Sequence, residues 1–373
     1  MATQNWDDHD RSGRYICRDA GHNYLASLPE DGAPIILTNG DNDTFPLWYV
    51  QEVEGERRDA RVCNLQYLQT DWYIDQLRRP AYDSPPLPID WQPADYITGQ
   101  NDVYDLSDLH TDTLHLSDRW DVPLRGRRTL YKNELALLEL LRHSDDRPVY
   151  VATSVGAEDY LNLDDHIVIE GLAARFTPDS QATSGEAGKT APPRLSTERT
   201  FHNLMTRFRF TGIADPHVYH DETARNMAYR YRRLFAQLAL ALISEQKATQ
   251  ARQVLARCDE VLPQECLPAD YLLGSDLDIA RAYVCLGMGS KAHERFEALA
   301  TSTVQLIRYY LSLSPSLFAT CHTSCLRQLY MLRSIAQEAS AAGDALADQL
   351  WQMTDSLYTS FEQQGGQIDA AKP

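Results

Sequence analysis

Two short acidic stretches contain the residues best suited to bind a ligand. Each follows an apolar run, and each has a tryptophan close by. Carboxylate and amide groups hydrogen-bond to sugar hydroxyls or bind a divalent cation, and an aromatic ring packs on the C–H face of a sugar. We therefore predict a sugar or cation site. Its candidate residues are Asn39, Asp41, Asn42, Asp43, Trp48, Asp71 and Trp72.

The sequence leaves two other interpretations of these acidic residues open. Asp43 or Thr44, and likewise Asp71, can cap helices whose first backbone N–H groups lack partners. A pair of carboxylates can also hydrolyse a glycosidic bond, provided that one has a raised pKa and the two lie about 5–10 Å apart. A nucleotide site is not expected, because Gly40 stands alone and no Walker, GxGxxG or GxSxG motif occurs.

A weaker metal candidate lies near the N-terminus. Asp7, Asp8 and Asp10 occur within NWDDHDRSG, and carboxylate oxygens suit Ca²⁺ or Mg²⁺. The spacing is not that of an EF-hand, and helix capping explains the same residues. We predict no cofactor other than this divalent cation.

The acidic stretches repeat one local pattern, which is strand, acidic loop, helix. We predict strands over 34–38 and 61–68, a helix that contains Pro46 and ends at Gly55, and a helix over 72–79. Strands joined through so short a helix are parallel, with a right-handed crossover. Ligands bind beyond the carboxyl ends of such strands. Both acidic stretches should therefore meet at one edge of a small parallel, Rossmann-like sheet.

The remainder of residues 1–177 is predicted to complete this α/β domain. We expect a helix over 14–28, an apolar helix after Leu130, a strand over 148–153, a short helix over 156–163, and a strand over 166–176 that bends at Gly171. Residues 80–122 are rich in proline and aspartate and read as an irregular acidic insertion. Its aromatic residues suggest that it packs on the domain.

The second half of the chain is predicted to be helical. A linker rich in small residues and proline covers 178–198, and a helical domain covers 199–373. Expected helices span 223–245, 247–262, 276–286, 290–313, 322–341 and 344–363. Helix–turn–helix pairs with alanine at the close positions resemble tetratricopeptide repeats, so we predict a helical-hairpin solenoid. A plain helical bundle is the alternative.

Charge and composition exclude several classes of function. The net charge is −18, of which residues 1–122 carry −14, and such an acidic surface would repel the phosphates of a nucleic acid. No run of about 18 apolar residues occurs, and the acidic N-terminus is not a signal peptide. The chain is therefore expected to be cytoplasmic or a fragment of a longer protein whose targeting segment lies elsewhere.

The cysteines and lone histidines are expected to be structural. The number of cysteines is seven, which is odd, and no paired CxxC motif indicates zinc. Buried free thiols are the main expectation, with a disulfide between Cys258 and Cys266 as the alternative. His22, His110 and His217 lack the spacing of metal ligands.

Several strings resemble one known family. They are NWDDHDRSGRY, TNGDNDTFPLWYVQEVEG, NLQYLQTDWYIDQLRR, LYKNELALLELL with RPVYVAT, and YRYRRLFAQLALALISEQ with ARQVLARCDEVLP. The family comprises multi-span inner-membrane proteins common in Bacteroidetes, catalogued as a domain of unknown function. Its membrane half looks like the GT-C glycosyltransferases, and its animal relative is a protein O-mannosyltransferase.

The resemblance implies a role without catalysis for this chain. In GT-C proteins the catalytic acid and the lipid-linked donor site lie in the membrane half, so no catalytic residue is carried over. This chain would be the region after the last membrane helix, on the periplasmic face of the inner membrane. It would bind or present the acceptor polypeptide through the helical domain, beside its own N-terminal membrane region. The alternative is a soluble sugar- or cation-binding module, or a hydrolase, acting at the GDND and TDW stretches.

Overall fold

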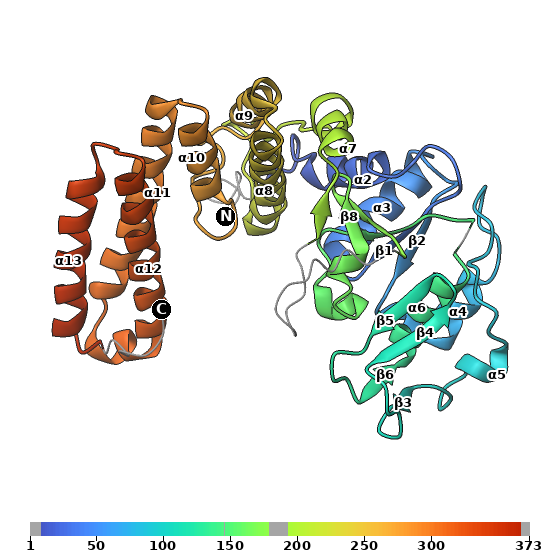
Figure 1. The fold of residues 1–373 in the computed structure, drawn as a ribbon. Coiled ribbons are helices and arrows are strands. Elements are labelled where there is room, and N and C mark those ends of the chain that lie inside the picture. The colour runs from blue at the N-terminus through green and yellow to red at the C-terminus, as the bar shows by residue number, and fades with distance from the viewer. Residues whose placement is uncertain (1–8, 145, 179–192, 367–373) are drawn as a thin grey trace. The chain divides into compact units, whose positions relative to one another are not determined.

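The computed structural model describes residues 9–144, 146–178 and 193–366 (Figure 1). The chain forms two compact units, Tyr15–Thr211 and Met1–Arg14 with Gly212–Pro373. We call them the α/β unit and the helical unit. The division falls after Thr211, whereas the sequence places the boundary within residues 178–198. Residues 193–211 belong to the α/β unit, because strand β10 (Arg194–Leu195) pairs with its sheet.

A six-stranded sheet forms the centre of the α/β unit, in the order β10-β8-β9-β7-β1-β2. The other strands are β1 (Ile35–Thr38), β2 (Arg61–Asn64), β7 (Val149–Ala152), β8 (Ile167–Ile169) and β9 (Ala173–Phe176). Strand β1 pairs in parallel with β2, as predicted, and it also pairs in parallel with β7. Strand β9 runs antiparallel to both β7 and β8, so the sheet is mixed and not purely parallel.

The segment 166–176 is a hairpin, which corrects the prediction of one bent strand. Gly171 lies between β8 and β9 with φ at +129°, a conformation that side chains disfavour. A Cβ there would also lie 2.6 Å from the Ser27 hydroxyl. The glycine therefore permits a reversal of the chain where a bend was expected.

Helices cover the two faces of the sheet. They are α2 (Ile16–Ala26), α3 (Asp41–Val53), α4 (Asp71–Leu77) and α6 (Lys132–Arg142), with a 3-10 turn η1 (Tyr67–Gln69) before α4. Helix α3 lies in the β1–β2 crossover and α6 in the return to β7, so right-handed connections place them on opposite faces (Figure 1). Helix α2 packs closely on α3, because a Cβ on Gly21 would lie 2.3 Å from the Pro46 carbonyl.

The acidic insertion contains more regular structure than the sequence suggests. It includes α5 (Pro93–Tyr96), β3 (Val103–Asp105), β4 (Thr113–Ser117) and β5 (Trp120–Pro123), and β6 (Thr129–Tyr131) follows it. Strands β3 and β6 form one antiparallel pair, and β4 and β5 form another. Of its aromatic residues, Tyr96 and Trp120 are buried, whereas Tyr104 is 49% exposed. The remaining elements of the unit are η2 (Ala157–Tyr160), η3 (Asp164–His166), α7 (Thr197–His202) and the π-helical η4 (Asn203–Arg207).

The helical unit consists of paired helices. They are α8 (Glu222–Ser244), α9 (Ala248–Val261), α10 (Asp276–Cys285), α11 (Gly289–Leu311), α12 (Pro315–Ala341) and α13 (Ala347–Gln363). Each helix packs on the next within the hairpins α8–α9, α10–α11 and α12–α13, and α8 also packs on α10. A helical C-terminal region is thus confirmed, while its tetratricopeptide-like, solenoid character stays a prediction. Helix α12 begins before the predicted start at His322, because Pro315 occupies its first turn.

None of the helices in the described ranges is long and apolar enough to span a membrane. Cys258 and Cys266 are both free thiols, so the alternative of a disulfide between them is wrong. Cys63, Cys258 and Cys325 are buried as expected, whereas Cys17 and Cys285 are exposed.

Candidate functional site

Asp43 lies in the first turn of α3, just beyond the carboxyl end of β1, and is almost fully buried. Its carboxylate accepts hydrogen bonds from the backbone N–H groups of Gly40, at 3.1 Å, and Asn39, at 3.4 Å. It accepts another from the hydroxyl of Ser154, at 2.7 Å, which follows β7. Asp43 therefore caps the helix and ties it to the neighbouring strand.

Asn39 and Asn64 extend this hydrogen-bonded network along the edge of the sheet. The Asn39 amide donates to Asp159 at 2.9 Å, while its side-chain oxygen is buried and has no hydrogen-bond partner within the described residues. The Asn64 amide donates to the Asn39 carbonyl at 3.2 Å and to the Thr44 hydroxyl at 2.9 Å. Burial, and next the charge of Glu158, raises the pKa of Asp159.

Asp71 has a different set of partners. It lies in the first turn of α4 and accepts hydrogen bonds from the Thr98 backbone N–H, at 2.8 Å, and the Thr98 hydroxyl, at 3.0 Å. The ammonium group of Lys132 is 3.8 Å away and also contacts Asp102. The Thr98 hydrogen bonds, with the Lys132 charge, lower the pKa of Asp71. Asp71 thus holds the acidic insertion against α4.

The other predicted acidic residues are not drawn into one cluster. Asp41 and Asn42 are exposed, and their side chains hydrogen-bond to no other residue in the described part of the chain. Asp10 accepts a hydrogen bond from the backbone of Ser12 at 2.8 Å, which is a local turn. The other two members of the N-terminal metal candidate, Asp7 and Asp8, lie outside the described residues.

Aromatic rings connect the two predicted stretches. Phe45 and Trp48 of α3 lie 5.7 Å apart, Trp48 and Tyr67 lie 6.4 Å apart, and Tyr67 and Trp72 lie 6.1 Å apart, between ring centroids. Trp72 is 59% exposed and Phe45 48% exposed. We call these four residues the aromatic surface. The sequence identified both tryptophans but not Tyr67, whose ring lies between them.

A pocket of about 300 Å³ adjoins the aromatic surface at Trp48. It lies between α3, β2, α4 and the turn at residues 81–84. The residues that line it include Trp48, Glu52, Arg58, Val62, Gln76 and Tyr82. The Tyr82 hydroxyl donates to the Glu52 carboxylate, and the Arg58 guanidinium lies 4.0 Å from the centre of the Tyr82 ring. The pocket therefore combines aromatic walls with charged groups of both signs.

The pocket also borders the free edge of the sheet. Strand β2 is the last strand, and the Arg61 N–H donates to Pro34 while the Leu65 N–H donates to Thr38. Since alternate residues of a strand face the same neighbour, Val62 turns its N–H and C=O away from β1, toward the pocket. The sequence could not identify this pocket, because residues 81–84 belong to the insertion and carry no motif.

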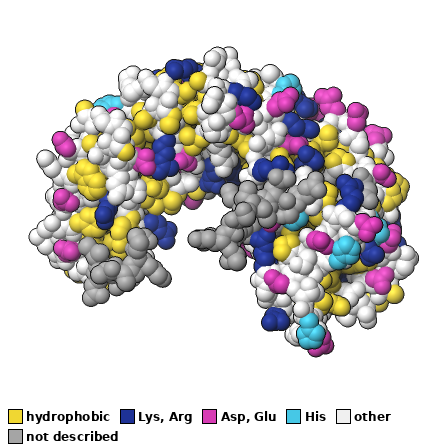
Figure 2. Space-filling view, viewed as in Figure 1, with side chains coloured by type: hydrophobic (Ala, Val, Ile, Leu, Met, Phe, Trp, Pro, Cys, Tyr) yellow, Lys and Arg dark blue, Asp and Glu magenta, His cyan; other side chains and the backbone are white. Residues whose placement is uncertain are grey.

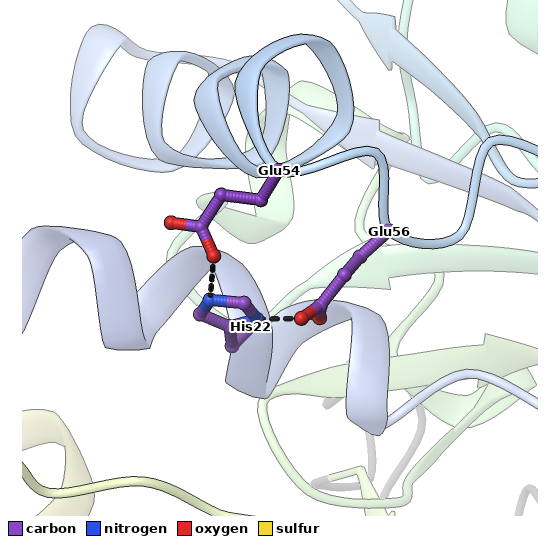
Figure 3. Close-up of side chains that lie close together, drawn as sticks. All are labelled: His22, Glu54 and Glu56. Carbon is purple, nitrogen blue, oxygen red and sulfur yellow. Dashed lines mark hydrogen bonds and ion pairs between the residues drawn. The ribbon is translucent and has the colours of Figure 1, made fainter.

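A second group of side chains surrounds His22 of α2 (Figure 3). Its Nδ1 lies 2.6 Å from a Glu56 carboxylate oxygen, and its Nε2 lies 2.9 Å from one of Glu54. Arg18 makes two hydrogen bonds to Glu54, and Arg209 lies 3.4 Å from Glu56. Both ring nitrogens and both carboxylates are therefore occupied, and the nearby arginines disfavour a bound cation. We interpret the group as a set of hydrogen bonds and ion pairs that holds α2 against the end of α3.

Comparison with protein-family models gives a match for the α/β unit. Residues 17–123 and 109–192 match the model of a family described as TMEM260-associated domain 2. TMEM260 is an animal protein O-mannosyltransferase, so the match links this chain to a glycosyltransferase-related protein. The matched residues include the aromatic surface and the pocket but not the helical unit. The comparisons with curated proteins and with solved structures give no match.

Proposed function

We propose that the α/β unit is a saccharide-binding, non-catalytic region of a glycosyltransferase-related protein that glycosylates polypeptides. The observation that carries the proposal is the aromatic surface beside the pocket. Both features lie within the residues matched by the family model. The unit would act on the periplasmic face of the inner membrane, beside a membrane region that supplies the chemistry.

The chemistry of the site supports a saccharide as the ligand. Exposed rings such as Trp72 offer flat apolar surface to the C–H face of a sugar. In the adjoining pocket, Glu52 accepts hydrogen bonds, Arg58 donates them, and the Val62 backbone offers one group of each kind. Sites for small polar ligands combine apolar walls with a few such polar groups.

The carboxylates do not support hydrolysis of a glycosidic bond. That reaction needs two carboxyl groups at a set separation, one with a raised pKa. The pKa of Asp71 is lowered instead, and Asp43 is engaged with the backbone and with Ser154. Of the described residues that line the pocket, only Glu52 is acidic. We therefore favour binding over bond cleavage.

A second candidate function places the acceptor polypeptide on the helical unit. Leu306 and Tyr309 of α11 are 44% and 59% exposed, and Leu317 of α12 is 56% exposed. Exposed apolar side chains on a helix pair can hold an extended or helical segment of a partner. The two candidate functions are compatible, because a glycosylated acceptor presents both a polypeptide and a sugar.

The test is a titration of the complete chain with methyl mannoside, a mannosylated peptide and the same peptide unmodified. Tryptophan fluorescence and saturation-transfer NMR report binding. We expect both mannosylated ligands to bind saturably, and Trp72→Ala to weaken them at least tenfold. The matched control is Tyr309→Ala, since Tyr309 and Trp72 are equally exposed at 59%.

Each outcome separates the two candidates. Loss of mannoside binding in Trp72→Ala, with no change in Tyr309→Ala, supports the saccharide site. Binding of the unmodified peptide that Tyr309→Ala weakens and Trp72→Ala spares supports the helical unit instead. Absence of saturable mannoside binding to the folded wild-type chain contradicts the proposed site.

A further inference from the structure

A third group of side chains that could bind a metal ion lies at the end of α6. Glu139 is in the last turn of that helix, and His143 follows at its C-terminus, four residues later. Residues four apart lie on the same helix face. Asp90 comes from the proline-rich segment between α4 and α5, and its backbone N–H donates to Glu139 at 3.2 Å. Two distant segments thus bring three potential metal ligands together.

The distances match those between ligands of a tetrahedral metal ion. His143 Nε2 lies 3.3 Å from Glu139 Oε1 and 3.5 Å from Asp90 Oδ2. One ligand atom from each residue lies within 4.8 Å of the other two. Bonds of about 2.0–2.1 Å at tetrahedral angles place neighbouring ligand atoms about 3.3 Å apart. Small side-chain rotations would therefore suffice to admit an ion.

The charges around this group also favour a cation. Within the described residues, Asp90 and Glu139 contact the His143 ring and have no lysine or arginine as an ion-pair partner. The C-terminal end of α6 adds the negative end of the helix dipole. The group at His22 differs, because Arg18 and Arg209 already neutralise its two carboxylates.

We propose that Asp90, Glu139 and His143 form a binding site for a divalent transition-metal ion of the zinc type. One imidazole and two carboxylates are ligands that Zn²⁺ accepts, whereas Mg²⁺ and Ca²⁺ prefer oxygen alone. The Asp90 side chain is 80% exposed and that of His143 30% exposed, so the fourth position is open to water. The ion would fasten the segment before α5 to the end of α6. This site does not depend on the saccharide function.

The test uses the complete chain, with any purification tag removed and metals stripped by a chelator. Zn²⁺ is titrated by calorimetry, and Co²⁺ by its visible absorption. We expect one equivalent to bind, the absorption of a four-coordinate Co²⁺ site, and a higher melting temperature with Zn²⁺. His143→Ala, and separately Asp90→Asn with Glu139→Gln, should weaken binding at least tenfold.

Two matched variants locate the ion. His115→Ala removes an exposed histidine that contacts a single carboxylate, Asp121, and should leave binding unchanged. His22→Ala removes the other histidine that lies between two carboxylates. Far-UV circular dichroism confirms that each variant is folded. The proposal is overturned if the wild-type chain binds no Zn²⁺, or if His22→Ala abolishes binding while His143→Ala retains it.

Discussion

The carboxylate of Asp43 and the hydroxyl of Ser154 lie 2.7 Å apart, and this hydrogen bond joins the start of α3 to the segment after β7. Asp43 is only 3% exposed, and its other contacts hold the first turn of the helix. Asp41, two residues earlier, is exposed to solvent. Neighbouring acidic residues at one sheet edge therefore have different roles, and the buried one maintains the fold.

This difference predicts unequal effects on stability. Asp43→Ala removes several hydrogen bonds and leaves the Ser154 hydroxyl and the backbone N–H groups of Asn39 and Gly40, which precede the helix, without their acceptor. We expect the free energy of unfolding to fall by about 1–3 kcal/mol. The control, Asp41→Ala, should change it by less than about 0.5 kcal/mol. Urea unfolding followed by circular dichroism measures both, and equal effects would refute the structural role of Asp43.

The sequence predicts local structure here better than it predicts contacts. Apolar runs that end in acidic, cap-forming residues correctly indicated β1, α3, β2 and α4, because strand and helix signals extend over only a few residues. The parallel pairing then followed from the short crossover. Trp48 and Trp72 could be expected near one another for the same reason. Their bridging ring, Tyr67, lies in a 3-10 turn where a strand was expected.

Contacts between distant segments were not predictable from spacing. The pocket needs Tyr82, which lies on the insertion, beside Glu52 of α3. His22 lacks any ligand-like spacing in the sequence, yet the packing of α2 on α3 brings it against Glu54. Tertiary packing determines such pairs, and a single sequence contains no signal for them. The only local trace of the proposed metal site is the spacing of Glu139 and His143 on one helix.

The hydrogen bonds of Asp71 predict a specific dependence of stability on pH. Its folded pKa lies below that of the unfolded chain, because Thr98 and then Lys132 stabilise the charged form. Asp71 therefore stabilises the fold above about pH 3.9, and this contribution is lost as the pH falls through the folded pKa. Asp71→Asn should make the melting temperature less sensitive to acid below pH 4.

Carboxyl-carbon NMR provides the direct measurement. We expect Asp71 to titrate below the usual range and Asp159 above it, since burial raises the pKa of Asp159. Thr98→Val removes the hydroxyl that donates to Asp71 and should move the Asp71 pKa upward. A pKa of Asp71 at or above that of an unfolded aspartate would contradict the observed hydrogen bonds.

The cysteines should differ sharply in reactivity. Burial raises the pKa of both Cys63 and Cys258 to about 12, so their thiols stay protonated and inaccessible near neutral pH. Cys17 and Cys285 are exposed. Alkylation of the native chain, read by peptide mass spectrometry, should label the exposed pair first. Cys63 and Cys258 should react only after unfolding, and a Cys258–Cys266 disulfide in the purified chain would contradict the structure.

The helical unit contains a buried ion pair whose removal should strongly destabilise the folded state. Arg232 and Asp276 are fully buried, with Nη1 and Oδ2 3.1 Å apart. Arg232 also donates to the carbonyl groups of Leu262 and Pro268, at 3.0 and 2.9 Å. The guanidinium therefore holds the loop between α9 and α10 against α8.

Arg232→Met should lower the free energy of unfolding by about 3 kcal/mol, because it leaves the Leu262 carbonyl and part of the Asp276 charge buried without a partner, whereas the Pro268 carbonyl still accepts a hydrogen bond from the Tyr229 hydroxyl. Arg295 remains beside Asp276 at 2.7 Å, which keeps the loss below that of a wholly unpaired charge. Arg281→Met is the matched control, since Arg281 makes ion pairs with Asp278 and Glu338 on the surface, where such pairs contribute about 0–1 kcal/mol. Urea unfolding compares the two variants. We expect the larger loss in free energy of unfolding for Arg232→Met, because water solvates the partners of Arg281 but cannot reach those of Arg232. Equal losses in the two variants would contradict a special role for the buried pair.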